Sequence, residues 1–123
     1  MKRYVAEPGS DAVRSAMQVA SGWFMCRIGF VETARAVGLV AGGSAVRRFA
    51  QEWPAFGVIE VDQDLTERAA SFAFPGPLRS LDALHLASAL LLPPAEVCVA
   101  TWDRRLSNAA RDQGLRVLPE RLD

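Results

Sequence analysis

Three acidic residues account for most of the chemistry that this sequence suggests. Asp82 stands near the front of residues 81–92, a segment that is mostly apolar and strongly helix-forming. Acids are seldom placed beside so much apolar surface unless they are paired, hydrated or bound to a metal. Glu32 and Asp103 occupy a similar kind of place, because each follows a strand-like run where a helix is expected to begin.

If the strands form a parallel sheet, these three carboxylates lie at one edge of it. Clustered carboxylates repel one another, which raises their pKa values, and a divalent cation removes that penalty. Ligand sets made only of oxygen favour Mg²⁺ or Mn²⁺ over zinc. Since Mg²⁺ keeps several waters and can activate one of them against a phosphodiester, the acids predict a hydrolytic metal site.

Each acid also has a purely structural explanation. Asp103 is suited to be the N-cap of the helix that follows it. Asp82, after Ser80 as a candidate cap, and Glu32 can both be acids of a first helical turn, stabilised by the helix macrodipole by about 0.3–1 kcal/mol. The three acids together are more specific than any one of them, and the structural and functional roles are compatible.

Other chemistries have less support. His85 is the only histidine, which rules out a multi-histidine zinc site, and its position three residues beyond Asp82 suits hydrogen bonding better than general-base catalysis. Gly42 and Gly43 lie between two expected helices, so they do not form a phosphate-binding loop. A receiver-like phosphoacceptor also gathers acids at a strand edge, but it needs a neighbouring lysine, and the only lysine here is Lys2.

The composition limits the kind of protein. The 123 residues suit one domain with a single core, and the formal net charge is zero, so any contact with nucleic acid must be local. No apolar run approaches the roughly 20 residues of a membrane span, and no signal peptide is visible. Cys26 and Cys98 are expected to be buried free thiols in a reducing compartment, which predicts a cytoplasmic protein.

Strand-like and helix-like segments alternate, which is typical of a parallel sheet covered by helices on both faces. Helices are expected over residues 11–18, 30–40, 45–53, 64–73, 81–92 and 104–113, with residues 2–6 as the tail of another and Ser10 as an N-cap; strands are expected over 23–28, 57–61, 97–101 and 115–118. Breaks are expected at residues 42–44 and 74–77. In such α/β sheets, ligands bind at the carboxyl ends of the strands.

Several segments resemble PIN-domain proteins, and in particular the VapC group of toxin ribonucleases. Residues 81–89 (LDALHLASA), 100–106 (ATWDRRL), 109–110 and 114–115 are similar to the C-terminal half of that family. Residues 30–36 (FVETARA) are similar to its first acidic helix, and residues 2–10 (KRYVAEPGS) to the helix and turn after its first strand. The resemblance covers nearly the whole chain as a single PIN-like domain, residues 1–123.

The resemblance implies a three-layer α/β/α sandwich with a mainly parallel sheet and a magnesium-dependent endoribonuclease, the toxin of a type II toxin–antitoxin system. It implies that Glu32, Asp82 and Asp103 are catalytic metal ligands and that Thr101 assists them, with Mg²⁺ or Mn²⁺ as cofactor. It also implies a cognate antitoxin, an RNA substrate and a homodimer. Arg35, Arg79, Arg104 and Arg105 are candidates for contacts with RNA phosphates, although each of them alone is also explained as a solvated surface residue.

The sequence departs from the family pattern at its N-terminus. The family's first strand and first acid are absent, and a helix that began Met1-Lys2-Arg3 would be uncapped, with positive charge at its positive end. In the favoured account the protein starts upstream of Met1 and is an ordinary nuclease. In the alternative, the chain is a truncated, catalytically impaired module that binds an antitoxin or dimerises without cleaving RNA. The coding DNA upstream of Met1 distinguishes the two accounts.

Overall fold

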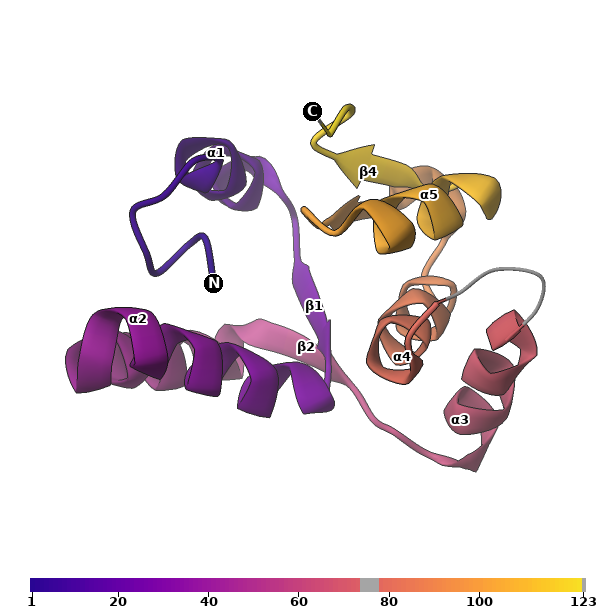
Figure 1. Cartoon of the computed structure of the whole chain (residues 1–123), viewed down its shortest axis with the longest axis horizontal. Coiled ribbons are helices and arrows are strands. Elements are labelled where there is room, and N and C mark those ends of the chain that lie inside the picture. Colours follow the sequence, from indigo (N-terminus) through magenta and orange to yellow (C-terminus); the bar gives the residue numbers. More distant parts are fainter. Residues whose placement is uncertain (74–77, 123) are drawn as a thin grey trace. The chain divides into compact units, whose positions relative to one another are not determined.

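A computed structural model describes residues 1–73 and 78–122, so the break expected at residues 74–77 lies outside the described residues. The chain divides into two compact units, Met1–Ile59 and Glu60–Asp123 (Figure 1). Each unit contains one pair of parallel strands with helices, so the predicted α/β class with mainly parallel strands is confirmed. The prediction of a single domain over residues 1–123 stays a prediction.

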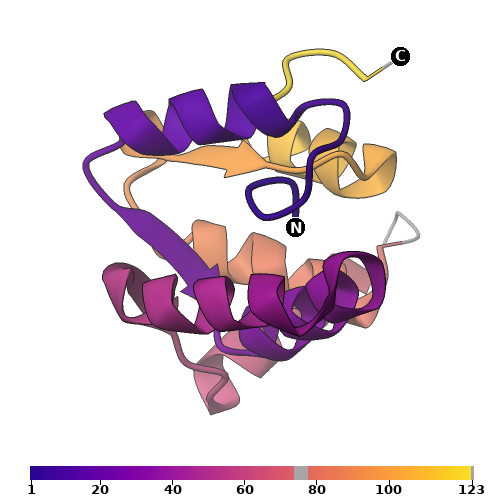
Figure 2. The ribbon, with the colours of Figure 1, turned by 90° about the vertical axis from the view of Figure 1, so that its left-hand side faces the viewer.

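The first unit contains two helices, a short 3-10 turn and two strands among its described residues. They are α1 (Ser10–Val19), β1 (Trp23–Cys26), α2 (Ile28–Glu52), η1 (Trp53–Ala55) and β2 (Phe56–Ile59). A short loop leads from α1 into β1 (Figure 2). Strands β1 and β2 pair in parallel with Trp23 opposite Phe56, and the backbone N–H of Arg27 continues the ladder by donating to the carbonyl of Ile59.

The glycine break expected inside the long helical stretch is present. Helix α2 runs from Ile28 to Glu52, but Gly42 has φ 78° and ψ −173°, which is outside the helical region. A Cβ built on Gly42 would meet no atom within 4 Å, so the backbone conformation and not lack of space favours glycine there.

The core of the first unit is centred on Phe49, whose side chain is fully buried. Its ring lies 5.2 Å from that of Tyr4, 5.4 Å from Phe30, 5.7 Å from Trp53 and 6.4 Å from Phe56, measured between centroids. Edge-to-face and stacked aromatic pairs of this kind add about 0.5–1.5 kcal/mol each to the burial of their surface. The aromatic cluster therefore joins the N-terminal turn, α2 and β2.

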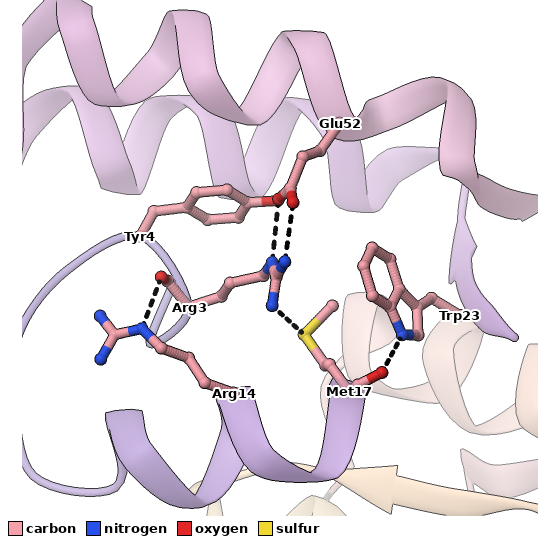
Figure 3. Close-up of polar contacts among 6 residues, drawn as sticks. All are labelled: Arg3, Tyr4, Arg14, Met17, Trp23 and Glu52. Carbon is pink, nitrogen blue, oxygen red and sulfur yellow. Dashed lines mark hydrogen bonds and ion pairs between the residues drawn. The ribbon is translucent and has the colours of Figure 1, made fainter. Parts of the chain in front are cut away.

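Polar contacts hold the N-terminal segment against α1, β1 and α2 (Figure 3). Arg3 donates from Nε and Nη2 to the two carboxylate oxygens of Glu52, at 2.9 and 2.7 Å, and the hydroxyl of Tyr4 donates to the same carboxylate. The guanidinium of Arg3 also lies 4.7 Å from the ring of Trp23, whose indole N–H donates to the carbonyl of Met17.

Two sequence-based expectations for this segment are wrong. Residues 2–6 form a hydrogen-bonded turn, with the N–H groups of Tyr4 and Val5 donating to the carbonyl of Met1, and they are not assigned to a helix. Ser10 is the first residue of α1 and not its N-cap, which is Gly9 with φ 92°. The Ser10 hydroxyl instead donates to the carbonyl of Val5 and accepts from the N–H of Glu7, because the chain turns back on itself there.

The second unit contains three α-helices, two 3-10 turns and two strands among its described residues. They are α3 (Gln63–Ala70), η2 (Ser71–Ala73), α4 (Ser80–Ala89), η3 (Pro94–Glu96), β3 (Cys98–Ala100), α5 (Arg104–Asp112) and β4 (Arg116–Leu118). Strands β3 and β4 pair in parallel, with Val99 opposite Val117, and β4 lies beside α5 (Figure 1). The buried core comprises Leu86, Leu106, Ala110, Leu115 and Val117.

Helix α5 ends as the glycine at its C-terminus predicts. Gly114 has φ 82°, its N–H donates to the carbonyl of Arg111 at 2.9 Å, and the next N–H, of Leu115, donates to that of Ala110 at 3.0 Å. This pair of bonds is the Schellman motif, and it turns the chain directly into β4.

The expectation for the second cysteine is wrong. Both cysteines are free, and Cys26 is buried with 1% of its surface exposed, but Cys98 is exposed. Residues alternate between the two faces of a strand, so Cys98 and Ala100 share the exposed face of β3, while Val99 packs against the core of its unit. In the residues that the structure describes, no helix is both long and apolar enough to span a bilayer.

Candidate metal-binding site

Helix α4 positions Asp82. The helix begins at Ser80, with Arg79 as the N-cap residue in extended conformation, so the expectation that Ser80 is the cap is wrong. Asp82 lies in the first turn, as predicted, and only 13% of its side chain is exposed. A carboxylate so placed keeps its charge at low cost only if a cation or hydrogen-bond donors accompany it.

Asp103 is positioned by the end of β3 and the start of α5. Its Oδ1 accepts from the N–H of Leu106 at 2.9 Å, so the predicted N-cap is confirmed. Its own N–H donates to the hydroxyl oxygen of Thr101 at 3.1 Å. Because the N–H of Thr101 in turn donates to the carbonyl of Leu118, the β3–β4 ladder fixes the turn that carries Asp103.

One guanidinium joins the two carboxylates. Arg79 donates from Nε to Oδ2 of Asp82 and from Nη2 to Oδ2 of Asp103, each at 3.0 Å. Asp82 and Asp103 come from different helices and are 21 positions apart in the sequence, yet both face the same cationic group. The structure thus brings these two predicted site residues together.

This arrangement fits a hard cation. Two carboxylates and one guanidinium leave one net negative charge, and a cationic group already lies between the two acids. The donor atoms are carboxylate oxygens, which Mg²⁺ and Mn²⁺ prefer. Since Mg²⁺ keeps several waters and uses one or two protein carboxylates, Asp82 and Asp103 are suited to hold it.

Glu32 belongs to the first unit, on helix α2, which follows the carboxyl end of β1 as predicted. The helix begins at Ile28, and its first turn contains no acid, so the structural explanation of Glu32 as a first-turn acid is wrong. Within residues 1–73 and 78–122, no group of three or more histidine, cysteine or acidic residues is gathered so as to hold a metal. The three-acid site combines residues of two units and stays a prediction.

The other candidate residues lie as follows. Arg35 is exposed on α2 of the first unit, and Arg104 and Arg105 are exposed in the first turn of α5, directly after Asp103. His85 is half-buried on α4, three residues beyond Asp82. The predicted contacts of Arg35, Arg104 and Arg105 with RNA stay predictions.

The contact of Arg79 with both acids was not anticipated from the sequence. Its spacing from Asp82 is a signal that could have suggested half of it, because residues three apart at a helix start are neighbours. The contact with Asp103 crosses 24 positions and depends on tertiary structure.

Comparison with known proteins gives the family. The PIN domain family matches residues 4–112, which include Glu32, Asp82, Thr101 and Asp103. The chain therefore belongs to the PIN domain family, and the resemblance found in its sequence is confirmed.

Its relatives include three ribonucleases of the VapC group. It is 39% identical over 79 residues to Ribonuclease VapC45 of Mycobacterium tuberculosis (strain CDC 1551 / Oshkosh) and to Ribonuclease VapC49 of strain ATCC 25618 / H37Rv. Each match covers 64% of this chain and 55% of the relative, so the chain spans about half the length of these two proteins. Ribonuclease VapC46 of the H37Rv strain is 30% identical over 118 residues, 96% of this chain and 89% of the relative. No solved structure gives a significant match.

Proposed function

We propose that the protein is a metal-dependent endoribonuclease, the toxin of a type II toxin–antitoxin system. The observation that carries the proposal is the convergence of Asp82 and Asp103, from two helix starts, on one cationic group. Membership of the PIN family and the ribonuclease names of the relatives support the substrate class. The proposed cofactor is Mg²⁺, with Mn²⁺ as a substitute.

In this proposal Asp82 and Asp103 hold the ion, and Glu32 completes the carboxylate set from α2. The bound ion supplies polarisation of the scissile phosphate and a lowered pKa for an attacking water. Thr101 acts as a positioning residue, because its hydroxyl fixes the backbone of Asp103. Arg35, Arg104 and Arg105, which are exposed, contact RNA phosphates.

The proposed partners follow from family membership. The resemblance to VapC-type toxins implies a small antitoxin, so we propose a cognate antitoxin, a homodimer and a cytoplasmic location for this protein. The zero net charge supports RNA recognition through local contacts and not through bulk attraction.

Asp82→Asn tests the proposal. The variant keeps the shape of the side chain but loses the charge that holds the ion, so RNA cleavage should fall by at least about a hundredfold. Asp64→Asn is the matched control, because Asp64 is also a first-turn acid paired with an arginine of its own helix. Both variants should keep the circular dichroism spectrum of the parent.

The assay uses the 123-residue chain and its two variants, each with Mg²⁺ and with EDTA. Cleavage that is lost with EDTA and in Asp82→Asn, but kept in Asp64→Asn, supports the nuclease. Cleavage that survives Asp82→Asn, or the absence of cleavage in every form, would overturn the assignment.

A catalytically silent interaction module is the second candidate. The observation that favours it is the guanidinium of Arg79, which already neutralises part of the charge of the acid pair. Stable binding of the antitoxin by a protein that cleaves no RNA with either Mg²⁺ or Mn²⁺ would support this alternative.

A further inference from the structure

We propose that Arg79 is a built-in competitor of the metal ion: its guanidinium occupies the space between Asp82 and Asp103 without metal and must leave when the ion binds. This inference rests on the proposed function, because it concerns the same pair of acids. It assigns to Arg79 a positioning and regulatory role that differs from that of a passive surface arginine.

The geometry supports mutual exclusion. Both contacts of Arg79 are made to Oδ2 atoms, while the other oxygen of Asp103, Oδ1, is engaged by the N–H of Leu106. The Asp103 oxygen that faces the guanidinium is therefore the one left to face an ion, and Oδ2 of Asp82 faces the same guanidinium. A divalent cation bound there would also repel the guanidinium, since like charges a few ångströms apart in a partly buried site disfavour each other.

The exposures of the three side chains show which of them can move. The side chain of Arg79 is 66% exposed, whereas those of Asp103 and Asp82 are 35% and 13% exposed. Arg79 can move outward when the ion takes its place beside the buried carboxylate of Asp82, because its long side chain keeps the charge hydrated. Asp82 has no such freedom, because it is held in the first turn of α4.

Once the ion has displaced it, the guanidinium of Arg79 can contact the RNA substrate. Arginine presents a planar fork that suits phosphate as well as carboxylate. When the ion replaces it on the acid pair, Arg79 stands at the edge of the site with its charge available to an RNA phosphate. The same residue then weakens metal binding in the resting protein and favours binding of the substrate in the metal-loaded one.

Binding of Mn²⁺ measured by electron paramagnetic resonance tests this inference, since the signal of free Mn²⁺ disappears when the ion binds. Arg79→Gln removes the competitor and should bind Mn²⁺ about two- to fivefold more tightly than the parent, because a largely exposed arginine contributes a factor of about five at most through an ion pair. Arg79→Lys keeps the positive charge but not the planar fork of the guanidinium, so its affinity for Mn²⁺ should lie between those of the parent and Arg79→Gln.

Arg68→Gln is the matched control. Arg68 is also exposed and paired with an acid of its own helix, Asp64, at 3.0 Å, so its loss changes the net charge equally but leaves the Asp82–Asp103 pair intact. It should bind Mn²⁺ like the parent. Thermal unfolding of every variant checks that the fold is kept.

The outcomes separate this inference from the proposed function. Equal or weaker Mn²⁺ binding by Arg79→Gln, with clear binding by the parent, would overturn the competitor role alone. Absence of Mn²⁺ binding by both proteins would overturn the metal site and with it the proposed function. A second readout follows from the proposed release of Arg79 toward the RNA. With Mn²⁺ saturating, Arg79→Gln should bind a short single-stranded RNA more weakly than Arg68→Gln does.

Discussion

Glu52 binds the N-terminal segment of the first unit to the end of α2. Its carboxylate accepts two hydrogen bonds from Arg3 and one from Tyr4, and these residues come from the N-terminal turn while Glu52 closes α2. The bonds from Arg3 hold the pKa of Glu52 below its usual value, with burial opposing them and Tyr4 adding to the effect. The pKa of the Tyr4 hydroxyl is raised, mainly by burial and then by its bond to Glu52.

Glu52→Gln should lower the free energy of unfolding at pH 7 by about 1–2 kcal/mol, between the values typical of an exposed ion pair and of a hydrogen bond to a charged group. The measurement is urea unfolding followed by circular dichroism. Glu67→Gln is the control, because Glu67 is an exposed acid that accepts one hydrogen bond from Gln63 on the same helix. An equal loss in the two variants would contradict the structural role of Glu52.

The pH dependence of that difference has a definite sign. Because the folded-state pKa of Glu52 is lowered, its stabilising effect is complete above the unfolded value of 4.5 and is lost as the pH falls through the folded-state value. The difference in free energy of unfolding between the parent and Glu52→Gln should therefore be constant from pH 6 to 8 and should shrink below about pH 4.5. For Tyr4 the raised pKa has the opposite consequence. Its contribution to the free energy of unfolding is complete below the unfolded pKa of 10.0 and is lost as the pH rises above that value.

At the scale of elements, two helix starts position the acid pair, and Asp103 has a separate task for each oxygen. Oδ1 caps α5 through the N–H of Leu106, and Oδ2 faces Arg79 and the predicted metal. The structural and the functional roles of this residue can therefore be separated by substitution. Asp62 at the start of α3 is a second N-cap outside the acid pair, since its Oδ1 accepts from the N–H of Leu65 at 2.9 Å.

Asp103→Asn should keep the cap, because Asn and Asp are similarly good N-caps, and should change the free energy of unfolding by no more than about 0.5 kcal/mol. Asp103→Ala should lose the cap and cost about 1 kcal/mol. Both should weaken Mn²⁺ binding to a similar extent. Asp62→Ala should cost the same stability as Asp103→Ala without changing Mn²⁺ binding, and a change in its metal affinity would refute the separation of the two roles.

What the sequence predicted well at this scale is local. The cap of α5, its end at Gly114 and the break at Gly42 each depend on the backbone preference of one residue and its immediate neighbours, and all three are present in the structure. Expectations that needed tertiary information were less secure. Ser10 bonds back to Val5 instead of capping α1, and Cys98 is exposed although its segment is apolar.

The candidate site shows the same division. Asp82 in a first turn and Asp103 as a cap were both predictable from their helices. Their meeting at Arg79 was not, because it requires α4 and α5 to pack against each other in the second unit. No local pattern in the sequence specifies which arginine among many faces a given carboxylate.

At the scale of the whole molecule, the predicted metal site draws on both compact units. Asp82 and Asp103 belong to Glu60–Asp123, whereas Glu32 belongs to Met1–Ile59. Metal binding is therefore the measurement that tests whether the two units cooperate in one function. Substitution of Glu32 is the sharpest form of that test, because it leaves the acid pair of the second unit unchanged.

If Glu32 shares the ion with the acid pair, Glu32→Gln should weaken Mn²⁺ binding by at least about tenfold, the loss seen even for outer partners of a metal site. In a protein that already carries Asp82→Asn, Glu32→Gln should change the Mn²⁺ affinity much less than it does in the parent. Residues that act on one ion are coupled, so their effects are not additive. Glu67→Gln removes the same charge from α3, where Glu67 is exposed, and should leave the affinity unchanged. If Glu32→Gln bound Mn²⁺ as the parent does while Asp82→Asn did not, the ion would be held by the second unit alone, and α2 would have no part in the site.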